Sequence, residues 1–290
     1  MKRILITGAG SYLGRSLRDY LGQWPERYQV EAVSVRGDSW KALRFQGYDV
    51  IYHTAALVHS EQNKQDPRLA ESYDRVNACL PVALAEKARS EGVGRFIFLS
   101  TMAVYGLTAP LGKTVTITAD TPVSPADLYG SSKAKAEAGL RGLETDRFRV
   151  AILRPPMIYG KGCKGNFRTL EAMARKMPMF PKIENQRSML YVGNLNRMVQ
   201  LIIDNEDRGL FFPQNEQYVS TSQMVQLIAA AQGKKLRLLP GFGWALAILR
   251  LFSPKVDKAF GSLCYDMGLS RYRENYCIAD LPESILESEQ

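Results

Sequence analysis

Tyr129 and Lys133 are the two residues whose types and spacing most directly suggest chemistry. A spacing of four residues on a helix places the phenol and the ammonium on one face. Because a nearby cation favours phenolate, we expect the pKa of Tyr129 to fall from about 10, so that the tyrosine acts as a general acid and base. Thr101 follows an expected strand and could place its hydroxyl beside the same reacting oxygen. The competing interpretation is an exposed tyrosine and lysine at helical spacing.

A glycine-rich segment, Thr7-Gly8-Ala9-Gly10-Ser11-Tyr12-Leu13-Gly14, joins an apolar run to a helical pattern. Glycines there allow a tight turn and let backbone N–H groups reach a pyrophosphate at the positive end of the helix. The spacing is irregular, because G-x-G-x-x-G requires glycine at Leu13 and G-x-x-G-x-x-G requires it at Ser11. A plain glycine turn is the alternative. The candidate phosphate contacts are Gly8, Gly10, Ser11, Tyr12, Leu13 and Gly14.

Short apolar runs alternate with longer helical patterns in the first half of the chain, which favours βα units on a parallel sheet. We expect strands at residues 3–7, 29–35, 50–53, 95–100 and 149–153, and helices at 12–21, 73–90 and 129–143. From Pro155 onward, prolines and glycines punctuate shorter pieces, and a helix at about 195–205 returns to the sheet. The prediction is an α/β fold with a doubly wound parallel sheet and a smaller, partly interleaved C-terminal lobe.

The composition is that of an ordinary soluble globular protein, with 46% hydrophobic and 23% charged residues among 290. It excludes disorder, collagen and coiled coil. The net charge of +9 favours anionic ligands without choosing among them.

Metal binding is not indicated, because the four cysteines lack C-x-x-C spacing and only His53 and His59 could assist them. We expect reduced thiols and no metal. We assign no catalytic role to either histidine and expect His53 to pack at a strand end. No run of about 20 apolar residues occurs, so we predict no membrane span and a cytoplasmic protein.

The motifs together resemble the extended short-chain dehydrogenase/reductases, and within them the nucleotide-sugar epimerase/dehydratase family. The resemblance rests on Tyr129 with Lys133 and on segments 7–14, 49–56 and 100–106. It continues through segments 153–160 and 185–192, so it covers nearly the whole chain. It implies a Rossmann domain at residues 1–155, rejoined by about 191–208, and a substrate-binding lobe at 156–290. It also implies a homodimer.

The resemblance implies a role for each motif residue. Tyr129 is the proton acceptor or donor, Lys133 holds the nicotinamide ribose, and Thr101 binds the sugar oxygen. Arg187 takes the place of the arginine that grips the substrate diphosphate. The further cofactor contacts are Ala55, Ala56 and Pro155, and Asn166 could contact the sugar nucleotide from a loop that could equally be ordinary surface.

Two departures from the family pattern refine the expected activity. Met102 and Ala103 stand where dehydratases carry Asp-Glu, which makes dehydration improbable. What remains is hydride transfer at a sugar carbinol, either C4 epimerisation of a UDP-hexose, as in UDP-glucose 4-epimerases, or reduction of a 4-keto sugar with NADPH. We keep epimerisation slightly ahead of reduction.

The second departure concerns the cofactor. Ser34 ends the second strand where NAD enzymes keep an acidic residue, and Arg36 lies two residues later. A hydroxyl and a guanidinium suit a 2′-phosphate, which favours NADP over NAD. The alternatives are that Glu31 or Asp38 reaches the ribose of NAD, or that Arg36 is a solvated loop charge.

Two rival interpretations are kept. The apolar segment 244–252, within the range 242–258, could dip into an acidic membrane interface while the enzyme acts on a lipid-linked sugar diphosphate. A helix buried in the smaller lobe is the favoured account of that segment. The other rival is a dinucleotide-binding regulator without catalysis, against which the intact Thr101, Tyr129 and Lys133 argue. No basic stretch with interleaved aromatics indicates nucleic acid.

Overall fold

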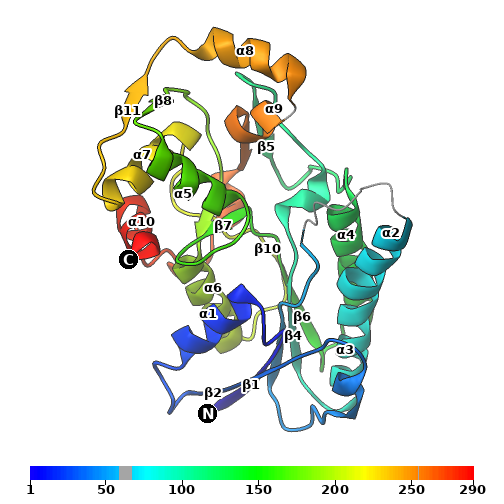
Figure 1. Ribbon diagram of the computed structural model, residues 1–290. Helices are drawn as coiled ribbons and strands as arrows, with labels where there is room; N and C mark the ends of the chain where they lie inside the picture. The colour runs from blue at the N-terminus through cyan, green and yellow to red at the C-terminus, as the bar shows by residue number, and fades with distance from the viewer. Residues whose placement is uncertain (59–66, 254) are drawn as a thin grey trace. The chain divides into compact units, whose positions relative to one another are not determined.

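The structure is a computed structural model that describes residues 1–58, 67–253 and 255–290. His59 lies outside the described residues. The chain divides into two compact units, each assembled from three separate stretches (Figure 1). Unit 1 comprises Met1–Gly106, Pro122–Arg154 and Met198–Phe211. Unit 2 comprises Leu107–Thr121, Pro155–Arg197 and Phe212–Gln290.

A six-stranded parallel sheet forms the centre of unit 1, in the order β10-β6-β4-β3-β1-β2. The strands are β1 (Lys2–Thr7), β2 (Tyr28–Val33), β3 (Val50–His53), β4 (Arg95–Leu99), β6 (Arg149–Leu153) and β10 (Gly209–Phe211). The strand order reverses between β1 and β3, the position at which doubly wound sheets bind their ligands. The predicted α/β fold with a doubly wound sheet is confirmed. The sequence analysis missed β10.

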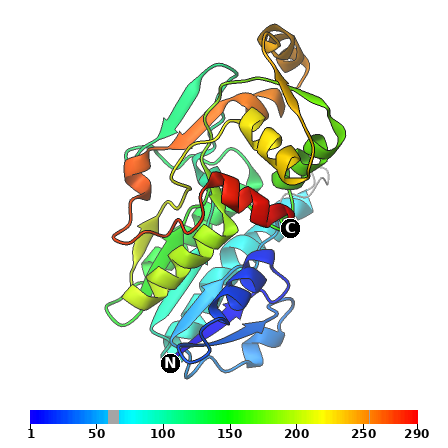
Figure 2. The ribbon, with the colours of Figure 1, turned by 90° about the vertical axis from the view of Figure 1, so that its left-hand side faces the viewer.

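Helices cover both faces of this sheet, so its central strands are apolar on both sides. Every residue of β3 is buried, and so are four of the five residues of β4 and of β6. Figures 1 and 2 show α3 (Leu80–Ser90) and α4 (Leu128–Leu143) on one face and α1 (Tyr12–Leu21) and α6 (Val192–Asn205) on the other. Helices α1 and α6 are joined by a hydrogen bond of 3.2 Å that Tyr20 of α1 donates to Gln200 of α6.

The helix predicted at 73–90 contains a wide turn. It runs from α2 (Pro67–Tyr73) through a π-helical turn (Asp74–Cys79) into α3. The turn buries Asn77, whose side-chain amide bonds the main-chain N–H and C=O of Leu57 at 2.8 and 2.9 Å. The polar backbone that follows β3 is satisfied in this way.

Among its described residues, unit 2 has three two-stranded parallel pairs and five helices. The pairs join β5 (Thr114–Ile117) to β12 (Ser262–Tyr265), β7 (Met157–Tyr159) to β9 (Met189–Tyr191), and β8 (Met179–Pro181) to β11 (Arg237–Leu239). The helices are α5 (Asn166–Lys176), α7 (Thr221–Ala231), α8 (Gly243–Phe252), α9 (Lys255–Phe260) and α10 (Leu281–Glu289). Short 3₁₀ turns at Ser39–Ala42, Met102–Tyr105 and Met267–Ser270 complete the two units.

Helix α8 differs from the favoured expectation of a buried helix. Leu246 is its one buried residue, whereas Leu251 and Phe252 are each 80% exposed. Across the described parts of the chain, no helix combines the length and the apolar character that crossing a membrane requires.

His53 is fully buried at the end of β3. Its Nδ1 lies 2.8 Å from the Thr7 hydroxyl, and its ring stacks between those of Phe96 and Phe98, with centroids 6.1 Å away in each case. Burial, reinforced by the nearby Lys133 ammonium, lowers the pKa of His53 to about 3. The imidazole is therefore neutral at physiological pH and acts as part of the core.

This burial predicts a specific acid sensitivity. In the unfolded chain the imidazole takes up its proton near pH 6.5, whereas in the folded chain it resists protonation until about pH 3. The contribution of the neutral His53 to the unfolding free energy is therefore fully present above pH 6.5. It is lost as the pH drops toward 3, by up to about 5 kcal/mol. His53→Asn, which keeps a polar atom for Thr7 but does not titrate, should flatten the fall in unfolding free energy measured by urea titration between pH 6.5 and 4. Identical pH slopes for the two proteins would contradict this assignment.

Candidate active site

Tyr129 and Thr101 meet where α4 begins beside the end of β4. Asp127 caps α4 by accepting a hydrogen bond of 2.7 Å from the Gly130 N–H. Thr101 caps the 3₁₀ turn after β4, because its hydroxyl accepts a 3.1 Å hydrogen bond from the Ala103 N–H. The side chains of Thr101 and Tyr129 are hydrogen-bonded to each other. The structure thus brings together the two hydroxyl groups that the sequence analysis singled out.

Gly130 permits this close approach. A Cβ atom at position 130 would lie 2.5 Å from the Ala103 carbonyl oxygen, which is backbone and cannot easily move. Any side chain there would push the first turn of α4 away from the turn that Thr101 caps. The glycine therefore sets the distance between the tyrosine and the threonine.

The electrostatics of Tyr129 differ from the expectation. Burial raises the pKa of the phenol to about 12, with smaller contributions in the same direction from Asp127 and Tyr73, and the hydrogen bond with Thr101 offsets only part of this. The expectation that Lys133 lowers this pKa is wrong for the protein without ligand. The low dielectric around the phenol penalises phenolate, and the ammonium is directed elsewhere. Tyr129 is therefore a protonated phenol at neutral pH.

Lys133 is 2% exposed and lies one helical turn after Tyr129. Its ammonium donates a 2.8 Å hydrogen bond to the Leu99 carbonyl and lies 4.6 Å from the centroid of the Phe98 ring. Burial lowers the pKa of Lys133 to about 7, and the neighbouring Glu137 carboxylate opposes that fall. An ammonium has three N–H donors, and Leu99 accounts for one of them.

Glu137 continues the same face of α4 and is 1% exposed. Arg154, which follows β6, holds its carboxylate through two hydrogen bonds of 2.9 and 2.5 Å. Ser100 and Arg141 donate further hydrogen bonds of 2.5 and 2.8 Å. The sequence analysis missed this group. An ionisable residue four positions after Lys133, on a helix face expected to be buried, was the available signal.

Arg154 also connects this carboxylate to the turn that Thr101 caps. Its guanidinium donates a 2.7 Å hydrogen bond to the Tyr105 hydroxyl and lies 5.0 Å from the centroid of that ring. Tyr105 ends the Met102–Tyr105 turn. One buried ion pair therefore ties α4, β6 and the Thr101 turn together.

The glycine turn lies at the end of β1, in the same unit. The N–H groups of Gly8 and Ala9 both bond the Val33 carbonyl, at 2.9 and 3.0 Å. Gly8 has a φ of 121°, and a Cβ there would lie 2.8 Å from the Ala55 nitrogen. Ser11 needs no positive φ, since it caps α1 at φ −70° and accepts from the Gly14 N–H. The irregular glycine spacing is thus explained by a serine cap.

Gly10 and Gly14 have different environments. A Cβ on Gly14 would lie 2.9 Å from side-chain atoms of Ile6 and Thr54, so helix α1 needs this glycine to pack on β1. A Cβ on Gly10 would meet nothing within 4 Å, which leaves open space beside the turn. Tyr12 and Leu13 are the first two residues of α1, whose N–H groups point toward this end. Ala55 and Ala56 follow β3 beside Gly8.

The end of β2 presents Ser34 and Arg36, both exposed. The Ser34 hydroxyl accepts a 3.3 Å hydrogen bond from the Arg36 N–H. The two acidic alternatives already have partners. Glu31 accepts a 2.7 Å hydrogen bond from Tyr48, and Asp38 pairs with Lys41 at 2.9 Å.

The remaining candidates belong to unit 2. Asn166 is the exposed first residue of α5, and Pro155 is the buried first residue of the stretch that follows Arg154. Arg187 donates hydrogen bonds of 2.7 and 3.2 Å to the carbonyls of Lys258 and Gly261, and burial lowers its pKa. Tyr129, Lys133 and Thr101 thus belong to unit 1, whereas Pro155, Asn166 and Arg187 belong to unit 2.

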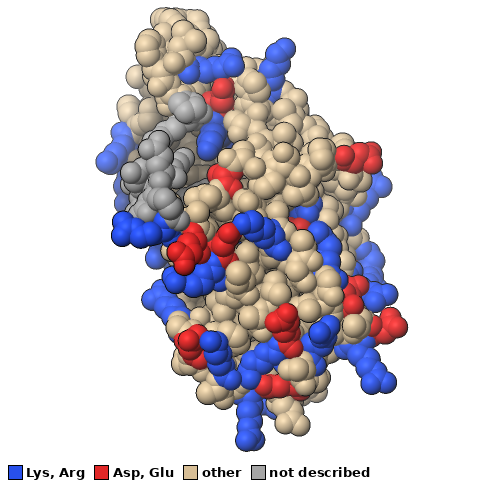
Figure 3. Space-filling view, turned by 90° about the vertical axis from the view of Figure 1, so that its right-hand side faces the viewer, with Lys and Arg blue, Asp and Glu red and all other residues tan. Residues whose placement is uncertain are grey.

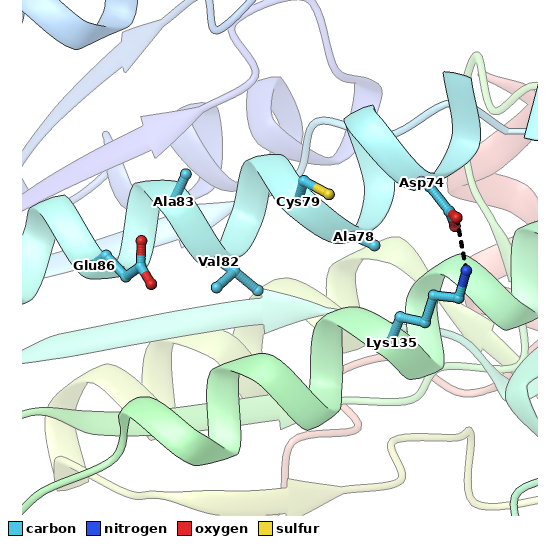
Figure 4. A pocket seen from close by; sticks show the side chains of 7 residues that line it. All are labelled: Asp74, Ala78, Cys79, Val82, Ala83, Glu86 and Lys135. Atoms are coloured by element: carbon cyan, nitrogen blue, oxygen red, sulfur yellow. Dashed lines mark hydrogen bonds and ion pairs between the residues drawn. The ribbon is translucent and has the colours of Figure 1, made fainter. Parts of the chain in front are cut away.

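A pocket of about 400 Å³ lies between the π-helical turn, α3 and α4 (Figure 4). It includes the exposed ion pair of Lys135 and Asp74, 2.7 Å apart. Neither Tyr129, Lys133 nor Thr101 lines it, so we do not place the active site there. The face of the protein shown in Figure 3 carries charges of both signs among uncharged side chains.

The buried ion pair predicts a large effect on stability. Glu137→Gln keeps the shape of the side chain but leaves Arg154 as an uncompensated buried charge, so the unfolding free energy should fall by about 3 kcal/mol. Arg141→Gln is the matched control, since it removes a half-exposed partner of the same carboxylate and should cost less than about 1 kcal/mol. Urea unfolding measures both. If the two variants lose the same small amount of unfolding free energy, the Glu137–Arg154 ion pair does not anchor α4.

Comparison with known proteins finds chains of similar sequence. A 30% identical relative, the UDP-glucose 4-epimerase of Vibrio cholerae, aligns with 92% of this chain and 88% of its own. An N-acetyl-alpha-D-glucosaminyl-diphospho-ditrans,octacis-undecaprenol 4-epimerase of Escherichia coli O157:H7 is 29% identical over 64% of this chain and 54% of its own.

The fold has a close counterpart among solved structures. The UDP-glucuronic acid 4-epimerase of Bacillus cereus in complex with NAD superposes with a TM-score of 0.75 at 16% identity, over 99% of this chain and 97% of its own. The sequence model of the NAD dependent epimerase/dehydratase family matches residues 4–211, which include the glycine turn, Thr101, Tyr129 and Lys133. The resemblance inferred from the motifs is therefore confirmed, and the chain belongs to the NAD dependent epimerase/dehydratase family.

Proposed function

We propose that this protein is an NAD(P)-dependent enzyme that epimerises a UDP-hexose at C4 by reversible hydride transfer. The observation that carries the proposal is the hydrogen-bonded pair of Tyr129 and Thr101, with the buried Lys133 one helical turn away. A protein that only binds a dinucleotide does not require a positioned phenol. The similarity to the Vibrio cholerae UDP-glucose 4-epimerase, which extends over most of both chains, supports this choice of reaction and substrate.

The residues around the glycine turn fit a dinucleotide. The backbone at Gly8 comes so close to Ala55 that no side chain is accommodated, whereas the space beside Gly10 is open. We propose that the N–H groups at the start of α1 hold the pyrophosphate and that Lys133 holds the nicotinamide ribose through its remaining N–H donors. When bound, the nicotinamide supplies the hydride acceptor and, in its oxidised form, a positive charge.

The proton is handled by Tyr129. In the oxidative half-reaction the C4–H bond would break as the bound nicotinamide takes up the hydride, and the C4 hydroxyl proton would pass to the phenolate of Tyr129. The positive charge of an oxidised nicotinamide bound beside the phenol would lower the pKa of Tyr129 from its ligand-free value of about 12, which would make phenolate accessible. In the reductive half-reaction Tyr129 would return the proton to the C4 oxygen, while the reduced nicotinamide would return the hydride to the opposite face of the ketone. Thr101 donates a hydrogen bond to the same oxygen.

We propose that dehydration is not part of this activity. Elimination requires an acid to protonate the leaving hydroxyl and a base to remove the neighbouring proton. Met102 and Ala103, the first residues of the turn that Thr101 caps, have side chains that can do neither.

Reduction of a 4-keto sugar is the second candidate, and the end of β2 favours it. Ser34 and Arg36 suit a 2′-phosphate, while Glu31 is held by Tyr48. NADPH that exchanges after each turnover serves a reductase, whereas an epimerase recovers its cofactor unchanged. The two reactions share Tyr129, Lys133 and Thr101, so these residues do not separate them.

The deciding experiment incubates the protein with UDP-, dTDP- and GDP-hexoses and with their 4-keto forms, each with NAD or NADPH. We expect NMR to show inversion at C4 of a UDP-hexose, with no net change in absorbance at 340 nm. Net oxidation of NADPH with a 4-keto sugar would identify the reductase instead.

Tyr129→Phe is the control for the mechanism. Loss of the phenolic proton should lower turnover about 10³-fold or more, in the range of general acid–base contributions. Dinucleotide binding, measured by fluorescence titration, should remain. Turnover that persists in Tyr129→Phe with the substrate used by the wild type would exclude this tyrosine as the proton carrier.

Cofactor preference provides an independent test. If Arg36 pairs with a 2′-phosphate, Arg36→Ala should raise the Kd for NADPH about tenfold, the effect of one charge-assisted hydrogen bond, and leave the Kd for NADH within about twofold. Arg44→Ala removes an equally exposed arginine and should change neither. Equal affinity of the wild type for NADH and NADPH would refute the preference.

A further inference from the structure

Helix α8 turns its apolar face outward. Leu246 is the one residue that it buries, while the opposite face carries a stripe with the spacing of one helical face. The stripe residues and their exposed fractions are Trp244 at 68%, Ile248 at 52%, Leu251 at 80% and Phe252 at 80%. An ordinary surface helix buries such a stripe against its own core. Here the stripe is exposed instead.

The segment of the chain that contains this stripe is basic. Between residues 234 and 258 there are six lysines and arginines and one acidic residue, Asp257, which is paired with Arg250 at 3.1 Å. In the surface view the α8 end, uppermost in Figures 1 and 3, shows mostly uncharged side chains, with lysine, arginine and acidic side chains next to them. Apolar surface next to positive charge complements an anionic lipid surface more closely than it complements another copy of this basic chain.

The length and composition of α8 fit a position in the plane of a membrane. Its ten residues extend about 15 Å, half of what is needed to cross the hydrocarbon core. Tryptophan and phenylalanine are suited to the boundary between head groups and acyl chains. We propose that α8 is an interfacial anchor that binds the protein reversibly to an anionic phospholipid bilayer through the stripe Trp244, Ile248, Leu251 and Phe252.

Such an anchor would place the enzyme where lipid-linked sugars reside. The proposal does not depend on the reaction catalysed, because the stripe and the basic residues lie within unit 2 and the Tyr129 group lies within unit 1. Binding to vesicles can therefore be measured without any substrate. Failure of the anchor and failure of the proposed activity are distinguishable.

The test is flotation of the full chain with vesicles of phosphatidylcholine alone or with 30% phosphatidylglycerol. We expect the wild type to float with the anionic vesicles and to be released by high salt. Leu251→Ser with Phe252→Ser should lower the partition coefficient more than about thirtyfold. Ile278→Ser with Leu286→Ser is the matched control, since these side chains are 53% and 49% exposed, and it should float as the wild type does.

The contribution of the lysine charges to binding and the insertion of Trp244 into the bilayer are tested separately. Lys235→Gln and Lys258→Gln should each lower binding to the anionic vesicles about fivefold. Trp244 fluorescence should shift to the blue on binding, with Trp244→Phe as the blank. A wild type that stays in solution with both kinds of vesicle would overturn the proposal, and so would flotation of the Leu251/Phe252 variant at the wild-type level. A third outcome is that the wild type does not float and that light scattering finds it oligomeric but the Leu251/Phe252 variant monomeric. The proposal would then be wrong, and the stripe would be a contact between copies of the protein.

Discussion

The arrangement of the candidate site depends on one buried carboxylate. Glu137 lies on the face of α4 that carries Tyr129 and Lys133, and Arg154 binds it from the end of β6. A buried charge is costly unless it is paired and hydrogen-bonded. The Glu137 carboxylate therefore favours the one arrangement of α4 on the sheet in which Arg154 can bind it. That arrangement also fixes Lys133 over Phe98 and Tyr129 beside Thr101.

Burial shifts the pKa values of Tyr129, Lys133 and His53 in different directions. It raises the pKa of Tyr129, lowers that of Lys133 and lowers that of His53. In each case the low dielectric disfavours the charged form. Without ligand, burial therefore opposes charge on each of these three groups, and charge introduced by a bound molecule acts with little screening. The chemistry that we propose relies on this sensitivity.

The sequence was sufficient to predict the sheet, because its central strands are continuous apolar runs and Thr7 to Gly14 marks the first turn. It could not reveal β10, since Gly209–Phe211 is too short to show a period. Nor could it reveal that Glu137 meets Arg154, because these residues touch only after α4 packs on the sheet. The predicted direction of the Tyr129 pKa shift was wrong for a related reason. Spacing on a helix indicates which groups are near each other but not how much water surrounds them.

The late position of β10 in the chain has a consequence for synthesis on the ribosome. Five of the six strands of the central sheet are complete once Leu153 has been made, yet the edge of β6 is paired only when Gly209–Phe211 emerges. During the intervening elongation the nascent polypeptide carries an uncovered, strongly apolar sheet edge, the kind of surface that chaperones recognise and that promotes aggregation. Folding of this enzyme cannot finish domain by domain from the N-terminus, and slow translation of the intervening stretch would prolong the period in which the incomplete sheet needs protection.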